Sequence, residues 1–85
     1  MFRIEFSRRA KKELKKLEKY KERIVEVLKI LSLDPVPARY YDVKKLRGLK
    51  NAFRIRIGRI RIVYTINWKD KVIIIARAEF RGRAY

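Results

Sequence analysis

The chain has 85 residues, of which 25 are Lys or Arg and 9 are Asp or Glu, so its formal net charge is +16. It contains no His and no Cys, which excludes a Ser-His-Asp triad, an imidazole acid or base, a thiolate nucleophile and a disulfide framework. A chain of this length is expected to form a single domain, residues 1–85, with one small core. So large a positive charge on a small folded domain indicates a polyanionic partner, with nucleic acid the first candidate.

The sequence predicts a soluble, cytoplasmic protein. Its longest wholly apolar run, Val72 to Ala76, is far shorter than the roughly 20 residues of a membrane span. The N-terminus lacks the pattern of a signal peptide. No group of residues has the composition of a metal site, and we expect no cofactor. The absence of Gln, with many Lys, Arg and Glu, is typical of proteins from very hot environments.

The first part of the chain predicts a strand followed by helices. Met1 to Phe6 alternates between apolar and charged residues, which favours a half-buried strand, and Ser7 is a suitable N-cap. The following segment predicts a helical hairpin rather than one long helix, and Asp34-Pro35-Val36-Pro37 ends it. Apolar residues recur there at helical spacing in two stretches: Ala10, Leu14 and Leu17, then Tyr20, Ile24, Val27, Leu28 and Leu31.

The second part predicts three consecutive strands after a connector at residues 38–52. Phe53 to Ile57 and Ile60 to Asn67 alternate, and the Gly58-Arg59 pair between them fits a type II′ hairpin loop. Residues 68–71 form a second turn, and Val72 to Phe80 reads as a central strand. The expected fold is α+β: an N-terminal strand, a helical hairpin and a three-stranded antiparallel meander. The strands form one antiparallel sheet with the helices on one face.

The hairpin register collects arginines on the face of the sheet that the helices leave open. It pairs Ile57 with Ile60, Arg56 with Arg61, Ile55 with Ile62 and Phe53 with Tyr64. Like charges directly opposite one another destabilise a sheet, whereas guanidinium groups bind phosphate in a bidentate fashion. Seven arginines in the last 33 residues favour a phosphate-binding face over one that is merely solvated. Members of this face are Arg54, Arg56, Arg59 and Arg61, with Arg77, Glu79 and Arg81 able to join it.

A set of short motifs, spread over nearly the whole chain, resembles the RelE toxin family of the RelE/ParE toxin–antitoxin superfamily. The motifs are Lys45-Leu46-Arg47-Gly48-Leu49, Phe53 to Gly58, Arg61-Ile62-Val63-Tyr64, and Arg81 with Tyr85. The resemblance implies a ribosome-dependent endoribonuclease that cuts mRNA in the ribosomal A site and so inhibits translation. It also implies a RelB-like antitoxin that wraps the toxin and blocks it.

The resemblance further implies which residues form the site. The catalytic positions are Arg54, Arg56, Arg61, Arg81 and Tyr85. Contacts to RNA or ribosome are expected from Lys44, Lys45, Arg47, Arg59, Arg77 and Arg83. Well-known members carry Lys where this chain has Arg54 and Arg56, and Arg does not deprotonate in proteins. Tyr85 is therefore the better candidate for the general base, and Glu79 is interpreted as an ion-pair partner.

Two other functions remain open. A ParE-like toxin would inhibit DNA gyrase by binding, but that branch generally lacks the basic and tyrosine set, so Arg61, Arg81 and Tyr85 argue against it. A non-catalytic RNA-binding module would lose affinity uniformly as each Arg is removed, without any cleavage.

Overall fold

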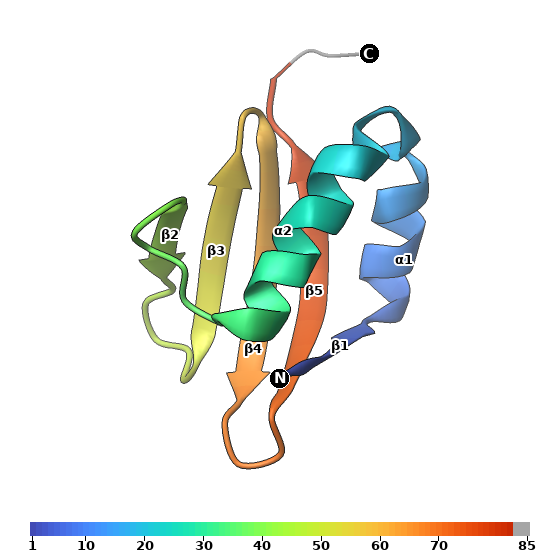
Figure 1. Cartoon of the computed structure of the whole chain (residues 1–85). Helices are drawn as coiled ribbons and strands as arrows, with labels where there is room; N and C mark the ends of the chain where they lie inside the picture. Colours follow the sequence, from blue (N-terminus) through green and yellow to red (C-terminus); the bar gives the residue numbers. More distant parts are fainter. Residues whose placement is uncertain (83–85) are drawn as a thin grey trace.

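Five strands form one sheet, and two helices cover one of its faces (Figure 1). The computed structural model describes residues 1–82 of the chain. Within these residues no helix is long and apolar enough to cross a bilayer. The elements are β1 (Arg3–Phe6), α1 (Arg8–Lys15), a 3-10 turn (Glu18–Tyr20), α2 (Lys21–Leu33), β2 (Asp42–Lys45), β3 (Ala52–Ile57), β4 (Ile60–Asn67) and β5 (Val72–Phe80).

The predicted meander is confirmed in its strands and in its register. Strands β3, β4 and β5 are consecutive antiparallel neighbours in the order β1-β5-β4-β3-β2. Gly58 has a φ of 62°, the left-handed conformation that the first position of a type II′ loop requires. The β3–β4 partners are those predicted: Ile57 with Ile60, Arg56 with Arg61, Ile55 with Ile62 and Phe53 with Tyr64.

The sheet differs from the predicted one in two respects. Strand β1 pairs with β5 in the parallel direction, so the sheet is mixed rather than wholly antiparallel. The region expected as a connector contributes an edge strand, β2, which pairs with β3. The first difference follows from the connection, because two helices lie between β1 and the rest of the sheet and allow a strand to return in either direction. The second difference arises because β2 has only four residues and one apolar residue, Val43, so its sequence does not show the alternation of a strand.

The helical hairpin is confirmed and is fixed to the sheet at its beginning. The Ser7 hydroxyl accepts a hydrogen bond from the Ala10 amide, as an N-cap does, and donates one to the Ala76 carbonyl at 3.0 Å. Helix α1 ends at Lys15, and the 3-10 turn leads directly into α2. One residue therefore starts α1 and ties it to β5, which places the helix beside the C-terminal half of that strand (Figure 1).

The core lies between the helices and the isoleucine face of the sheet. Alternate residues of β3 and β4 are buried there against the buried residues of α2, which are Ile24, Val27 and Leu31. Tyr64 is fully buried among them, as its place in the strand predicts, and its hydroxyl donates a 2.7 Å hydrogen bond to the Pro35 carbonyl. Burial, with the nearby charge of Asp34, raises the pKa of Tyr64 above its usual value.

Replacing Tyr64 by Phe is expected to lower the free energy of unfolding by about 1–2 kcal/mol, because the buried Pro35 carbonyl loses its partner. The raised pKa adds a second effect. Tyr64 must stay neutral in the folded state, so it stabilises the fold below pH 10, its ordinary pKa, and that contribution is lost as pH rises further. Urea unfolding at pH 7 and at pH 11 should show a smaller alkaline loss for Tyr64→Phe than for the wild type. Equal losses would contradict this role.

Candidate nucleic-acid interface

The face of the sheet opposite the helices carries four arginines in adjacent strands. Arg54 and Arg56 come from β3, Arg61 from β4 and Arg77 from β5. Arg56 and Arg61 are direct cross-strand partners, and Arg61 is in turn opposite Glu79 of β5. The repulsion expected between Arg56 and Arg61 is therefore moderated by carboxylates on both sides of the pair.

Asp42 of β2 holds the two arginines of β3. Its Oδ2 atom accepts a hydrogen bond from Nε of Arg56 at 2.9 Å. The same atom lies 2.8 Å from Nη2 of Arg56 and 3.3 Å from Nη1 of Arg54. The hydrogen bond from Arg56 is the main cause that lowers the pKa of Asp42, and Arg54 lowers it further. Arg56 is thus oriented at the surface, while Arg54 is only 8% exposed and lies beneath it.

The Asp42→Asn variant is expected to bind single-stranded RNA about threefold more tightly, because one negative charge leaves a cationic surface. Its folding should become less sensitive to acid. The pKa of Asp42 is lowered in the folded state, so this carboxylate stabilises the fold above its ordinary pKa of 3.8, and that contribution is lost as pH falls below it. Fluorescence polarisation with a labelled oligonucleotide measures the affinity. Asp70→Asn makes the same charge change in the β4–β5 turn, and an equal gain there would contradict a local effect.

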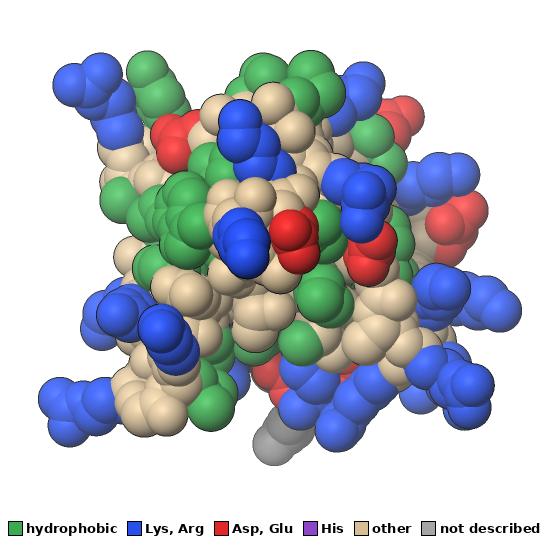
Figure 2. All heavy atoms as spheres, turned by 90° about the horizontal axis from the view of Figure 1, so that it is seen from below, with side chains coloured by type: hydrophobic (Ala, Val, Ile, Leu, Met, Phe, Trp, Pro, Cys, Tyr) green, Lys and Arg blue, Asp and Glu red, His purple; other side chains and the backbone are tan. Residues whose placement is uncertain are grey.

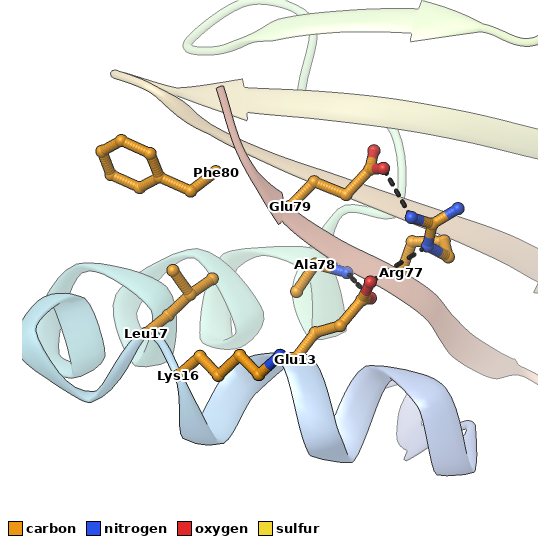
Figure 3. A pocket seen from close by; sticks show the side chains of 7 residues that line it. All are labelled: Glu13, Lys16, Leu17, Arg77, Ala78, Glu79 and Phe80. Atoms are coloured by element: carbon orange, nitrogen blue, oxygen red, sulfur yellow. Dashed lines mark hydrogen bonds and ion pairs between the residues drawn. The ribbon is translucent and has the colours of Figure 1, made fainter. Parts of the chain in front are cut away.

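A second carboxylate network connects the arginine face to α1. Glu79 lies 3.4 Å from Nε of Arg61 and 2.6 Å from Nη2 of Arg77. Glu13 reaches across from α1, contacts Nε of Arg77 at 3.3 Å and accepts a 2.8 Å hydrogen bond from the Ala78 amide (Figure 3). The contact with Ala78 occupies the edge of β5 beyond the end of β1. A hollow of about 550 Å³ lies here, lined by Glu13, Lys16, Leu17, Arg77, Ala78, Glu79 and Phe80.

Among residues 1–82, two buried N–H groups in this cluster find no hydrogen-bond partner. They are Nη1 of Arg54 and Nε of Arg61, and each lies near a carboxylate without reaching hydrogen-bond geometry. A buried donor without a partner costs about 1–3 kcal/mol, so such groups are rare in purely structural networks. Both belong to adjacent strands at the centre of the arginine face.

Arg59 and Arg81 lie at the end of the sheet that carries the β3–β4 hairpin. The Arg81 amide donates a 2.8 Å hydrogen bond to the Arg59 carbonyl, so the backbone after β5 is joined to the hairpin tip. A hollow of about 560 Å³ opens there, lined by Arg56, Gly58, Arg59, Arg81 and Gly82. Because Arg56 lines this hollow, it connects the hairpin end to the arginine face.

Comparison with known proteins identifies the family. The model of the ParE toxin of the type II toxin–antitoxin system parDE matches residues 4–84. RelE1 of Methanocaldococcus jannaschii is 37% identical over 89 residues, covering 99% of this chain and 94% of the relative. The chain belongs to the RelE family of the RelE/ParE toxin superfamily.

Solved structures of RelE proteins have the same fold. The RelE–RelB complex from Pyrococcus horikoshii contains a chain that is 38% identical, with a TM-score of 0.83 and 98% of both chains covered. The RelB–RelE complex from Methanococcus jannaschii gives 27% identity and a TM-score of 0.75, covering 91% of this chain and 89% of that one. The mixed sheet with two helices on one face is therefore shared with RelE toxins.

The positions that the RelE resemblance implies fall into three groups. Arg54, Arg56, Arg61 and Arg77 lie on the open face, with Lys44 opposite Arg54 in the register, while Arg59 and Arg81 lie at its hairpin end. Lys45 pairs with Phe53 on the face that the helices cover, and Arg47 lies in the turn after β2, at the opposite end of β3 from Arg56. Arg83 and Tyr85 lie outside the described residues.

Asp42 and Glu13 belong to the arginine cluster, and the sequence did not indicate either of them. Asp42 could have been found only if β2 had been predicted, because the register of β2 with β3 places Asp42 opposite Arg56. Glu13 reads as part of a solvated Lys-rich helix face, and it reaches a residue 65 positions away. The sequence interpretation of Glu79 as an ion-pair partner agrees with its two contacts to arginine.

Positive charge surrounds this RelE-family protein beyond the site itself. Seen from the end that carries the β4–β5 turn, Lys and Arg side chains project around much of the periphery and outnumber the Asp and Glu side chains (Figure 2). Four lysines are exposed on or next to α1: Lys11, Lys12, Lys15 and Lys16. Such a field attracts a polyanion without sequence preference, and the arginine face supplies the directed contacts.

Proposed function

We propose that this protein is the toxin of a RelBE-type module and cleaves mRNA in the ribosomal A site, stopping translation. The observation that carries the proposal is the position of Arg56 and Arg61, which are direct cross-strand partners at the centre of an open, arginine-rich face. Guanidinium groups stay charged at all relevant pH values and match the geometry of a phosphate. A phosphate placed between two strands would meet both of them.

The proposed reaction is an internal transfer at phosphorus that needs no external nucleophile. The 2′-oxygen of a ribose attacks the adjacent phosphate and gives up its proton to a base. The bond from phosphorus to the 5′-oxygen breaks, and that oxygen takes a proton from a water molecule. The products are a 2′,3′-cyclic phosphate and a 5′-hydroxyl end. Catalysis then requires cations for the charge that develops on the phosphorane, and an acid and a base for the two proton transfers.

The residues can be assigned to these roles. Arg56 and Arg61 stabilise the charge on the phosphorane, and Arg81 stabilises the leaving 5′-oxygen. Arg54 acts as a positioning residue, since it is buried and contacts the same Asp42 oxygen as Arg56. Tyr85 is proposed as the general base, because neither Arg54 nor Arg56 can deprotonate.

The partners of this toxin are proposed from the relatives. The RelE proteins of Pyrococcus horikoshii and Methanococcus jannaschii are found in complexes with RelB, which supports a RelB-like antitoxin for this chain. The ribosome would place the codon against the arginine face and supply the orientation that so small a protein cannot build by itself. The place of action is then the cytoplasm, where mRNA is translated.

Mapping of mRNA ends in a translating extract tests the proposal. Wild-type protein is expected to produce new 5′ ends within A-site codons, detected by primer extension. The Arg81→Ala, Tyr85→Phe double variant should produce none. Intact mRNA with the wild-type protein, while its binding to RNA is retained, would exclude the endonuclease and leave the RNA-binding module.

Inhibition of DNA gyrase is the second candidate function, because the family model that matches this chain is named for the ParE toxin. A ParE-like toxin would block supercoiling of relaxed plasmid DNA by purified gyrase. We expect no block at concentrations of the protein that arrest translation. A block that persists in the Arg61→Ala variant would favour the ParE-like function over the proposed one.

A further inference from the structure

Arg23 of α2 belongs neither to the sequence motifs nor to the open face of the sheet. Its guanidinium lies against the tip of the β3–β4 hairpin, with Nη1 and Nη2 each 3.5 Å from the position that a Cβ atom on Gly58 would take. Nη1 of Arg59 lies in the same way 3.6 Å from the Cβ position of Gly82. Two guanidinium groups thus lie beside two glycines at one end of the sheet, each at ordinary van der Waals distance from the Cβ position.

These arginines differ in their partners from those of the open face. Arg54, Arg56, Arg61 and Arg77 each have a carboxylate within 4 Å. Within residues 1–82, no ion pair is formed by Arg23, Arg59 or Arg81. Glu22 and Glu26 are close to Arg23 in the sequence, but neither pairs with it. We name Arg23, Arg59 and Arg81 the hairpin-end arginines.

Two hollows meet at the hairpin tip and connect these arginines. The larger, of about 560 Å³, is lined by Arg56, Arg59 and Arg81 with the two glycines. The smaller, of about 210 Å³, is lined by Tyr20, Arg23, Ile57, Gly58, Arg59, Ile60 and Phe80. Gly58 and Arg59 belong to both. A strand that lies in the larger hollow and continues past the tip therefore comes to Arg23.

We propose that Arg23, together with Arg59, binds a phosphodiester of the RNA strand next to the one held by Arg56 and Arg61. Uncompensated cations that gather in a hollow repel one another until an anion enters, and a nucleic-acid backbone supplies anions at regular intervals. Arg23 is then a positioning residue that fixes the strand beyond the reacting phosphate. The inference deepens the proposed function and rests on it for the identity of the ligand.

The salt dependence of RNA binding tests this inference. The probe is a fluorescein-labelled RNA hexanucleotide with 2′-O-methyl groups, which removes the nucleophile and prevents cleavage. Arg23→Gln is expected to bind about threefold to tenfold more weakly than the wild type. The slope of log affinity against log salt should become shallower by about 0.7, the loss of one phosphate contact to a single strand. Arg23→Lys should recover the slope, because it keeps the charge.

Arg8→Gln is the matched control, because it removes one exposed arginine from the first residue of α1. That residue follows Ser7, which is bonded to the middle of β5 at Ala76 and not to the hairpin tip. The variant should leave the slope unchanged. A wild-type slope for Arg23→Gln, an equal loss in Arg8→Gln, or no binding by the wild type would overturn the inference. Cleavage in the translating extract is scored separately. If the wild type does not cleave mRNA but Arg23→Gln still lowers the salt slope, only the proposed function is refuted. If the wild type cleaves but Arg23→Gln keeps the wild-type slope, only the role of Arg23 is refuted.

Discussion

Arg61→Ala is expected to lower the rate of mRNA cleavage on ribosomes by about 10²–10³-fold, the usual effect of removing one charge-stabilising donor. Arg61 stands at the centre of the open face, opposite Arg56, and its side chain is 40% exposed. A phosphorane oxygen would meet the exposed part of its guanidinium in the transition state. The loss should therefore appear in the single-turnover rate at saturating toxin rather than in the concentration needed for saturation.

Two controls separate this role from a structural one. Arg61→Lys keeps a positive charge without the planar guanidinium, so its rate should fall between those of the wild type and Arg61→Ala. The midpoint of urea unfolding should change little in both variants, since the Arg61 side chain is 40% exposed. If the rate falls only in proportion to the folded fraction, or if Arg61→Ala cuts as fast as the wild type, the assignment of Arg61 is wrong.

Ile55→Ala is expected to lower the free energy of unfolding by about 2–5 kcal/mol, because it leaves a cavity in the core. Ile55 is fully buried under the helices and is paired with Ile62 on one side and Val43 on the other. It also lies between Arg54 and Arg56 in the same strand, so a loosened β3 should reduce cleavage as well. A small domain has only about 5–15 kcal/mol of total stability, so the effect is a large share of it.

Ile74→Ala is the matched control for this prediction. Ile74 belongs to β5, but its side chain is 39% exposed on the other face of the sheet. The same deletion of atoms there should cost less than about 1 kcal/mol. Urea unfolding followed by circular dichroism measures both variants. Similar losses for the two would mean that the isoleucine face is not the core of the molecule.

The fold could be predicted from the sequence wherever the pattern is local. Strict alternation in Phe53–Ile57 and Ile60–Ile62, with a loop of two residues, determines the hairpin register, and the register determines that Arg56 faces Arg61. The parallel pairing of β1 with β5 joins residues about 70 positions apart, and no local pattern contains it. Strand β2 is too short, and has too few apolar residues, to be distinguished from a connector.

The site was predictable to a similar extent and for the same reason. Its arginines follow from alternation, but their counter-charges do not. Asp42 reaches the site through an edge strand, and Glu13 reaches it through the packing of α1 on β5. Arg23 comes to the hairpin tip because α2 packs there, beside Gly58. Each of these depends on tertiary packing, which composition and periodicity do not specify.

Purified ribosomes that carry a defined mRNA codon in the A site give the most direct test that the arginine face cuts mRNA. With end-labelled mRNA, the wild-type protein should yield one product, cut within that codon and ending in a 2′,3′-cyclic phosphate. No product should form without ribosomes, with Arg61→Ala at matched times, or with a 2′-deoxy nucleotide at the cut. Cleavage that persists with the 2′-deoxy nucleotide would contradict the proposed chemistry. Uncut mRNA on ribosomes that have bound the wild-type protein would contradict the nuclease function itself.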